Sequence, residues 1–319
     1  MASNAISFLF KHKFKILSLI ALVFIILIWR FPYQELRPLI TQKIYELSGQ
    51  RLSVIFQTMN ISLIPLKLAI SDVTINSPNF KKGLRFDKIM LIPGIDLFLK
   101  KLPSGKLIIE NIFSGRLSLS LSPGRPTENG GRLFKAELLV DHLSLINLMK
   151  TLGNQIEMDG KITTRIAGEI DPSLNTQPDL DWSVEIEQWN VGESQFNTMM
   201  GPLTIPGLSL GTAQGTGRWS NGKLQIESLK LGGKDSPING EIKGYVQLMI
   251  VSQMGHISWQ TSGLQLDIYL TVLNQIPNQL AIFLSLIERY KTGVPGGNLY
   301  KVRVTQSSPY SPPSFGPIN

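Results

Sequence analysis

The sequence contains no cysteine and only three histidines, and both shortages limit its chemistry. Without cysteine the chain has no disulfide, no thiolate nucleophile and no cysteine-based metal site. The histidines, His12, His142 and His256, lie far apart, and none has a partner at metal-ligand spacing. We therefore predict no metal and no cofactor. The absence of cysteine is compatible with an oxidising periplasm.

Charged residues are also scarce, at 17% of the chain, against about 25% in an ordinary soluble protein. Hydrophobic residues make up 43%. This balance favours a domain with much buried sheet or with an exposed apolar surface. The net charge of +8 is of the kind that nucleic acids and anionic membranes attract. However, lysine and arginine are spread singly along the chain and no nucleic-acid-binding motif is present, so we predict no nucleic-acid partner.

The main apolar stretch near the N-terminus organises the rest of the chain. Ile16–Trp29 carries no charge and is bordered by Lys15 and Arg30. Extending the stretch to Phe14–Tyr33 reaches the roughly 20 residues that a membrane-spanning helix needs, provided that the two flanking charges reach the headgroups. Aromatic residues at its C-terminal end fit a membrane interface.

Two other interpretations of this stretch are weaker. A cleaved signal peptide needs a small-residue cleavage site, which Trp29-Arg30-Phe31-Pro32 does not provide. A buried core helix is disfavoured by the basic flank at residues 11–15. We predict a cytoplasmic tail at residues 1–13 and a transmembrane helix at residues 14–33. The denser basic charge on the N-terminal side favours a single-pass protein of the bacterial inner membrane, with the remainder in the periplasm.

After the predicted anchor the apolar pattern changes from helical to alternating. Residues 34–49 place apolar side chains on one helical face, which predicts a helix packed on the following domain or lying on the membrane. From Arg51 the apolar period is two, and the runs end at Gly, Pro, Asn or Asp. Asp159-Gly160, Asn221-Gly222 and Asn239-Gly240 are typical of type I′ hairpin turns. These features predict an antiparallel meander.

The predicted fold is therefore mainly β: a transmembrane helix followed by an elongated, curved antiparallel sheet over residues 34–305. A few helices would pack on it, at residues 142–153 and 273–290 with a helical turn at 96–102. Residues 172–178 are the best candidate for a boundary between two lobes. Residues 306–319 are rich in serine and proline and are predicted to be disordered.

Motifs that resemble catalytic ones lack their structural context. Gly207–Gly211 matches a nucleophile elbow, and Ser209, Asp235 and His256 follow in a formal triad order. An elbow needs a helix after the serine, which the glycine-rich residues 212–217 do not favour. Gly211, Gly215 and Gly217 also lack the Gly-Lys-Ser/Thr of a phosphate loop. We name no catalytic or cofactor-binding residue and predict that the protein is not an enzyme.

The small number of predicted helices relative to strands instead indicates an exposed apolar surface. An alternating sheet has one apolar face, and that face needs a covering layer. The few predicted helices are too short to cover a long sheet. We therefore expect a trough that is open to an acyl chain or to a partner strand.

The order of several weak motifs resembles the type II secretion system protein N family over roughly residues 15–305. The segments that carry the resemblance are Phe31-Pro32-Tyr33 after the anchor, Pro93-Gly94, Gly160–Gly168, Gly222–Leu224, Leu229–Gly232 and Ile238–Gly244. The resemblance implies an accessory inner-membrane component that binds other secretion-system proteins during export of folded proteins across the outer membrane. It also implies a distant likeness to AsmA-type envelope proteins, so a lipid-binding or lipid-transfer protein is the alternative. The family has no catalytic residues to carry over.

Overall fold

The computed structural model describes residues 33–78, 80, 83–127, 131–153, 156–198, 201–233, 236–253, 256–273 and 284–318, together with Ser18 and Leu22. The predicted cytoplasmic tail and nearly all of the predicted transmembrane helix at residues 14–33 lie outside this part. A search of the described residues for a helix long and apolar enough to span a bilayer finds none.

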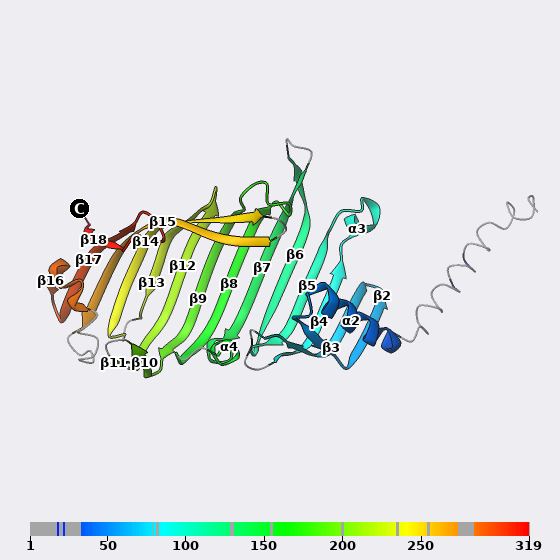
Figure 1. Cartoon of the computed structure of the whole chain (residues 1–319), viewed down its shortest axis with the longest axis horizontal. Helices are drawn as coiled ribbons and strands as arrows, with labels where there is room; N and C mark the ends of the chain where they lie inside the picture. Colours follow the sequence, from blue (N-terminus) through cyan, green and yellow to red (C-terminus); the bar gives the residue numbers. More distant parts are fainter. Residues whose placement is uncertain are drawn as a thin grey trace, which may run out of the picture.

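The described residues form a sixteen-stranded antiparallel sheet, drawn out into an elongated band (Figure 1). Its spatial order is β1-β3-β4-β5-β6-β7-β8-β9-β12-β13-β14-β15-β17-β16, with β2 paired to β3 and β18 paired to β17. The strands are β1 (Ser53–Ile55), β2 (Thr58–Leu63), β3 (Leu66–Asn76), β4 (Leu84–Pro93), β5 (Gly105–Ile112), β6 (Gly115–Pro126), β7 (Arg132–Ser144), β8 (Met158–Ile170), β9 (Asp179–Val191), β12 (Leu208–Ser220), β13 (Lys223–Leu231), β14 (Ile238–Gln253), β15 (His256–Leu273), β16 (Lys291–Val294), β17 (Gly297–Gln306) and β18 (Ser314–Pro317).

Short helices and one separate hairpin complete the described fold. The hairpin consists of β10 (Ser194–Thr198) and β11 (Gly201–Ile205), between β9 and β12. The helices are η1 (Tyr33–Leu36), α2 (Arg37–Leu47), α3 (Ile95–Leu99), α4 (Leu145–Leu152) and η3 (Glu288–Tyr290). The predicted mainly β meander is confirmed, as are the helices that the sequence indicates near residues 34–49, 96–102 and 142–153.

Only one of the three predicted hairpin turns is a turn. Asn221 and Gly222 join β12 to β13 with φ of 51° and 70°, as a type I′ turn requires. Asp159-Gly160 instead lies inside β8 at an irregularity in its pairing with β9. Asn239-Gly240 lies inside β14, where Gly240 pairs with both neighbouring strands. Local turn propensity therefore yields to strand pairing at two of these sites.

The predicted boundary between lobes at residues 172–178 is a tight connection inside one sheet. β8 and β9 pair along their lengths on either side of it, from Met158↔Val191 to Glu169↔Asp179. Asp171, only 6% exposed, orders the connection because its carboxylate accepts backbone hydrogen bonds from Ser173, Asn175 and Thr176. The described sheet is thus continuous across this segment.

The C-terminal region also differs from the prediction. Within the predicted disordered tail, β18 pairs with β17, and the Phe315 carbonyl accepts hydrogen bonds from Arg289 and Tyr290 at 3.0 and 2.6 Å. Most of the predicted helix at 273–290 lies outside the described residues. Its first residue, Leu273, is the last residue of β15, and its last three residues form η3.

A compact core closes the N-terminal end of the sheet. Its members are buried residues of β2 to β5 and of the β1–β2 connection, and side chains of η1 and α2 pack against them. The buried members are Phe56, Met59, Val73, Phe86 and Ile112. Leu36 and Ile40 are the helical side chains that cover them. This end of the sheet therefore has the covering layer that an apolar face requires.

Candidate functional site

The strand register aligns apolar side chains into continuous rows along one face of the sheet. Paired residues of an antiparallel sheet point to the same face, and so do residues two apart in a strand. One row takes one residue from each strand between β3 and β17: Leu68, Leu91, Leu107, Leu119, Leu138, Ile166, Trp182, Gly217, Ile226, Gly244, Leu266 and Val304.

A second, neighbouring row is equally apolar apart from one threonine. It consists of Ile70, Ile89, Ile109, Leu117, Val140, Thr164, Val184, Gly215, Leu229, Ile242, Ile268 and Val302. We call the surface formed by these two rows the aliphatic face. Alternation in each strand was visible in the sequence, but the alignment of the rows was not.

The opposite face of the sheet is polar. One of its rows runs through Thr163, Glu185, Gln214, Lys230, Glu241, Tyr269 and Lys301. Cross-strand ion pairs join other residues of this face, including Arg165 with Glu137 at 2.8 Å and Arg218 with Asp179 at 2.8 Å. The sheet is therefore two-sided, with a solvated face and an aliphatic face.

The aliphatic face is not fully covered between its two ends. Side chains in its middle, such as Leu138, Ile166 and Val184, are only half-buried. Leu119 and Leu91 are 38% and 45% exposed. Among the described helices, α2 packs at β1 and α4 packs against β7 and β8 near one edge. A large contiguous apolar surface of this kind is typical of an interaction site.

Trp182 lies in the aliphatic face above two glycines of the neighbouring strand. A Cβ atom on Gly217 would lie 2.7 Å from Trp182 Cζ2, and one on Gly215 would lie 3.2 Å from its Cζ3. The glycines therefore leave room for the indole ring against the sheet. Within the described part of the chain, the buried Trp182 Nε1 has no hydrogen-bond partner.

The hairpin of β14 and β15 extends beyond its neighbours at one edge of the sheet. β13 begins opposite Gln247, and β17 ends opposite Leu264. Beyond these residues the two strands pair only with each other, after a register irregularity between Gln247 and Leu248. We call residues 248–253 and 256–261 the strap. Figure 1 shows its arms in yellow, crossing the upper part of the sheet in this view.

Four contacts hold the strap beside the aliphatic face. Trp219 donates from Nε1 to the Leu248 carbonyl at 3.0 Å, and its ring stacks on Trp259 with centroids 5.5 Å apart. Gln177 donates to the Ile250 carbonyl at 2.8 Å and accepts from the Ile250 amide at 2.9 Å. Trp219 is paired with Leu224 in β13 and with Leu180 in β9, so its side chain points to the same apolar face as theirs. The strap therefore lies at the rim of that side.

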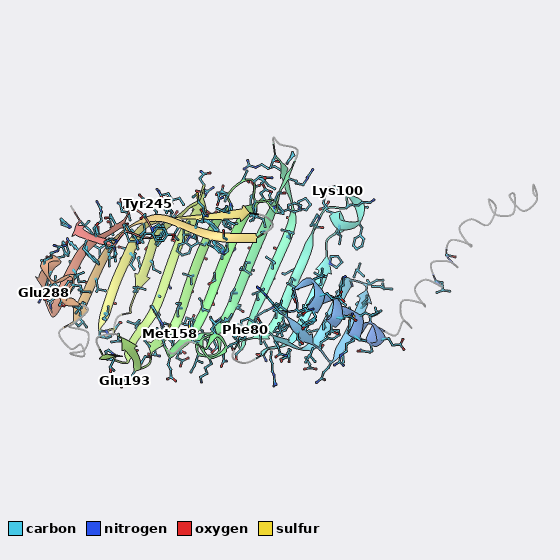
Figure 2. The ribbon with its side chains drawn as sticks, viewed as in Figure 1. Phe80, Lys100, Met158, Glu193, Tyr245 and Glu288 are labelled. Carbon is cyan, nitrogen blue, oxygen red and sulfur yellow. The ribbon has the colours of Figure 1, made fainter. Side chains whose placement is uncertain are left out.

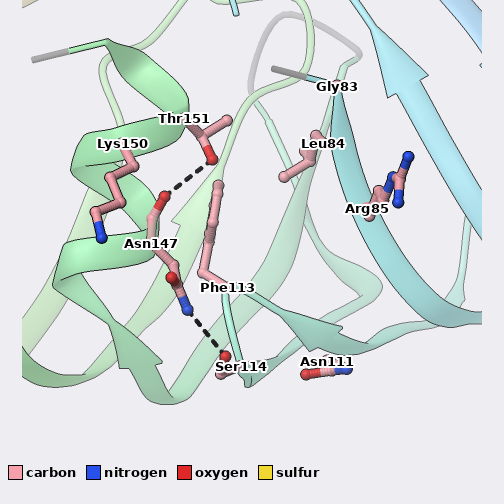
Figure 3. Close-up of a pocket in the computed structure, with 9 residues that line it drawn as sticks. All are labelled: Gly83, Leu84, Arg85, Asn111, Phe113, Ser114, Asn147, Lys150 and Thr151. Atoms are coloured by element: carbon pink, nitrogen blue, oxygen red, sulfur yellow. Dashed lines mark hydrogen bonds between the residues drawn. The ribbon is translucent and has the colours of Figure 1, made fainter. Parts of the chain in front are cut away.

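A pocket of about 670 Å³ lies between α4 and the N-terminal core. Figure 3 shows Phe113 in its centre and Leu84 beside it, with Lys150 and Arg85 directed away. Asn147 donates to Ser114 at 3.0 Å on its rim. The pocket thus has a mixed lining in which Leu84 and Phe113 are the apolar side chains, and the two cations do not converge in it.

The residues of the formal catalytic motifs lie in extended strand. Ser209 is exposed and pairs with Asn190, with no helix after it, so the elbow geometry is absent from this described strand. Gly215 and Gly217 also lie within β12, where they pair with β13. Asp235 and the side chain of His256 are outside the described residues. Across the described residues, a search for clusters of His, Asp or Glu able to hold a metal finds none.

An ion pair on the polar face predicts a pH effect on stability. Arg303 donates to both carboxylate oxygens of Asp267 at 2.6 and 2.8 Å, which holds the pKa of Asp267 below its ordinary 3.8. Because the folded pKa is depressed, this stabilisation is present above pH 3.8 and is lost as the pH falls through the folded value. We expect Asp267→Asn to reduce the loss of stability on acidification, measured by urea unfolding at neutral and acidic pH.

The same substitution at Asp181 is a suitable control, since its side chain is 76% exposed and lies 3.9 Å from Arg218. Exposed pairs contribute little. Equal acid sensitivity of Asp267→Asn and the unsubstituted protein would contradict the prediction.

The fold and this site together define a class: an elongated antiparallel β-sheet protein with one solvated face and one partly uncovered aliphatic face. Comparison of the chain with protein-family models, with curated proteins and with solved structures found no match.

Proposed function

We propose that this chain is a non-catalytic envelope protein that binds the hydrocarbon chains of lipids along its aliphatic face. The observation that supports the proposal is the continuity of the two apolar rows across twelve strands, β3 to β17. At about 4.8 Å between neighbouring strands, the rows extend for roughly 50 Å. That length exceeds the roughly 30 Å hydrocarbon core of a bilayer.

The chemistry of the rows favours an extended apolar ligand over a polar one. Thr164 is the one side chain in the two rows with a hydroxyl group, and the rows contain no charge. Binding would come from apolar area removed from water, at about 25 cal/mol per Å². Such a surface distinguishes ligands by the length of their hydrocarbon chain rather than by their headgroup. This property suits lipid binding or lipid transfer.

The setting that we propose is the periplasmic side of the inner membrane, with residues 14–33 as the anchor. An accessory role in type II secretion is the second candidate. It is favoured by the position of the segments that carry the resemblance, since Gly222–Leu224, Leu229–Gly232 and Ile238–Gly244 lie in or beside the adjacent strands β13 and β14. Its partners would be other components of the secretion system.

A charge in the middle of the aliphatic face tests the lipid proposal. Val184 belongs to the second row, and Ser183 precedes it in β9 on the opposite face, level with Arg165 and Thr216. We expect Val184→Asp to lose most of the lipid that co-purifies with the full chain, because a carboxylate beside a hydrocarbon chain must be desolvated. Ser183→Asp should retain it. Lipid is measured by extraction and mass spectrometry at equal protein amounts.

Thermal unfolding of both variants separates loss of binding from loss of fold. No lipid on the folded unsubstituted protein, or equal lipid on both variants, would overturn the proposal. The secretion role makes a different prediction: deletion of the gene stops export of secreted proteins while the outer-membrane barrier stays intact.

A further inference from the structure

One corner of the sheet exposes a dense group of large apolar side chains. In α3, Ile95 is 71% exposed, Phe98 is 59% exposed and Leu99 is 73% exposed. Ile64, in the turn between β2 and β3, is 93% exposed. We call these four residues the apolar corner. Single exposed apolar residues are ordinary, but a contiguous group marks an interaction site.

The strand register brings the two parts of the apolar corner to the same edge of the sheet. Leu68 pairs with Leu91 in the β3–β4 ladder. The start of β3, which follows Ile64, therefore lies at the same edge of the sheet as the end of β4, which precedes α3. Figure 1 shows α3 projecting above the ends of β4 and β5.

Hydrogen bonds fix α3 in its exposed position. Ser104 accepts the Leu97 amide on its Oγ at 3.1 Å, and its carbonyl accepts the Gly94 amide at 2.9 Å. The Lys100 amide donates to the Asp96 carbonyl at 3.0 Å. The apolar side chains are therefore held out by an ordered loop.

Basic residues flank the apolar corner in the sequence. Lys100 forms an ion pair with Asp96 at 2.8 Å. Among the described residues, Lys67, Lys101 and Lys106 have no ion-pair partner. Figure 2 shows Lys100 at the outer edge beside α3. An exposed apolar group with lysines beside it in the sequence complements a bilayer interface with anionic headgroups.

The start of the described body lies at the same end of the molecule. Residue 33 leads into η1 and α2, which pack beside β1 and β2 (Figure 1). On α2, Leu39 and Leu47 are 63% and 77% exposed. The predicted anchor at residues 14–33 would therefore enter the bilayer close to this end. Proximity of the anchor makes the bilayer the occupant best placed to meet the corner.

We propose that the apolar corner inserts into the surface of an anionic bilayer and orients the sheet, with its N-terminal end against the membrane. This contact goes beyond the proposed lipid binding of the aliphatic face and does not depend on it, but it rests on the proposed anchor at residues 14–33. It would set one end of the aliphatic face beside the lipids of the membrane.

The absence of cysteine allows a direct test in the full chain. Leu99→Cys supplies a single thiol for an environment-sensitive nitrobenzoxadiazole label. The control is Leu152→Cys, 50% exposed on α4 at the opposite edge of the sheet (Figure 1). Each labelled protein is reconstituted into vesicles of phosphatidylcholine with phosphatidylglycerol. A nitroxide on the upper acyl chain of phosphatidylcholine reports insertion by quenching.

The expected result is a blue-shifted emission and loss of fluorescence to the nitroxide at Leu99→Cys, with neither change at Leu152→Cys. Adding Lys101→Gln should lower the ratio of inserted to free label about fivefold, since one basic residue near an anionic surface contributes about 1 kcal/mol. Vesicles of phosphatidylcholine alone should lower it further.

Absence of quenching at Leu99→Cys, or equal quenching at both positions, would overturn the proposal. The Val184→Asp substitution serves as an internal check, because it should leave quenching at Leu99→Cys unchanged while it removes lipid from the aliphatic face. Failure of one proposal is therefore distinguishable from failure of the other.

Discussion

Replacing Phe56 with alanine should lower the free energy of unfolding by about 3–5 kcal/mol, the usual cost of removing a buried phenylalanine ring. Phe56 is 1% exposed and lies in the core cluster at the N-terminal end of the sheet. Its ring also lies under the Arg37 guanidinium, 5.8 Å from centroid to Cζ. The cavity would separate α2 from the first strands. Urea unfolding followed by circular dichroism measures the loss.

Phe98→Ala provides the matched control. The same ring is removed, but Phe98 is 59% exposed on α3, so the expected change is within about 0.5 kcal/mol. Similar losses for the two variants would show that the core cluster does not stabilise the N-terminal end as described.

The second large effect is expected at Gly217. A Cβ at this position would collide with the Gln225 carbonyl of the neighbouring strand and with Trp182, whose Cε2 lies 2.8 Å away. Backbone and indole must both shift, so Gly217→Ala should destabilise the fold by about 1–3 kcal/mol, in the range of overpacked sites. The change is measured by thermal and urea unfolding. Displacement of Trp182 should also alter tryptophan fluorescence.

Gly293→Ala is the control for added volume. A Cβ at Gly293 in β16 meets no atom within 4 Å, so stability should change by no more than about 0.5 kcal/mol. An unchanged stability of Gly217→Ala would mean that the glycine is not needed for the seating of Trp182 in the aliphatic face.

Phe56 and Gly217 lie at two different parts of the aliphatic face, its covered N-terminal end and its middle. At the N-terminal end, the buried core and α2 cover it. In the middle, glycines of β12 let a broad indole lie against the sheet while the aliphatic side chains stay half-exposed. A long sheet with one end covered and the middle accessible suits an extended apolar ligand better than a compact one, which is the basis of the proposed lipid binding.

The sequence predicted the strand-rich meander because alternation is local. Each strand of a half-buried sheet must place apolar residues two apart, and the chain does so from Arg51 onward. The pattern could not distinguish a turn from an irregularity inside a strand. Asp159-Gly160 and Asn221-Gly222 have similar residues, yet only the second is a turn. The partner strand decides between them, and it is not contiguous in sequence.

The connection at residues 172–178 is a second place where local sequence did not predict the path of the chain. Its proline and polar residues resemble a linker, and the sequence placed a lobe boundary there. In the structure, Asp171 accepts several backbone hydrogen bonds and turns the chain directly from β8 into β9. Composition indicates that a segment is neither strand nor helix, but it does not distinguish a tight turn from a linker between two lobes.

By itself, the sequence determined that this protein is a cysteine-free, glycine-punctuated β protein, because composition and side-chain period are properties of the chain alone. Tertiary structure alone decided that Ile166, Trp182 and Ile226 share one row, and that the β2–β3 turn and α3 lie at the same edge of the sheet. The physical reason is register. A shift of one residue in any strand pairing would move its apolar side chains to the solvated face. The register is therefore set by the burial of apolar side chains from all the strands on one face.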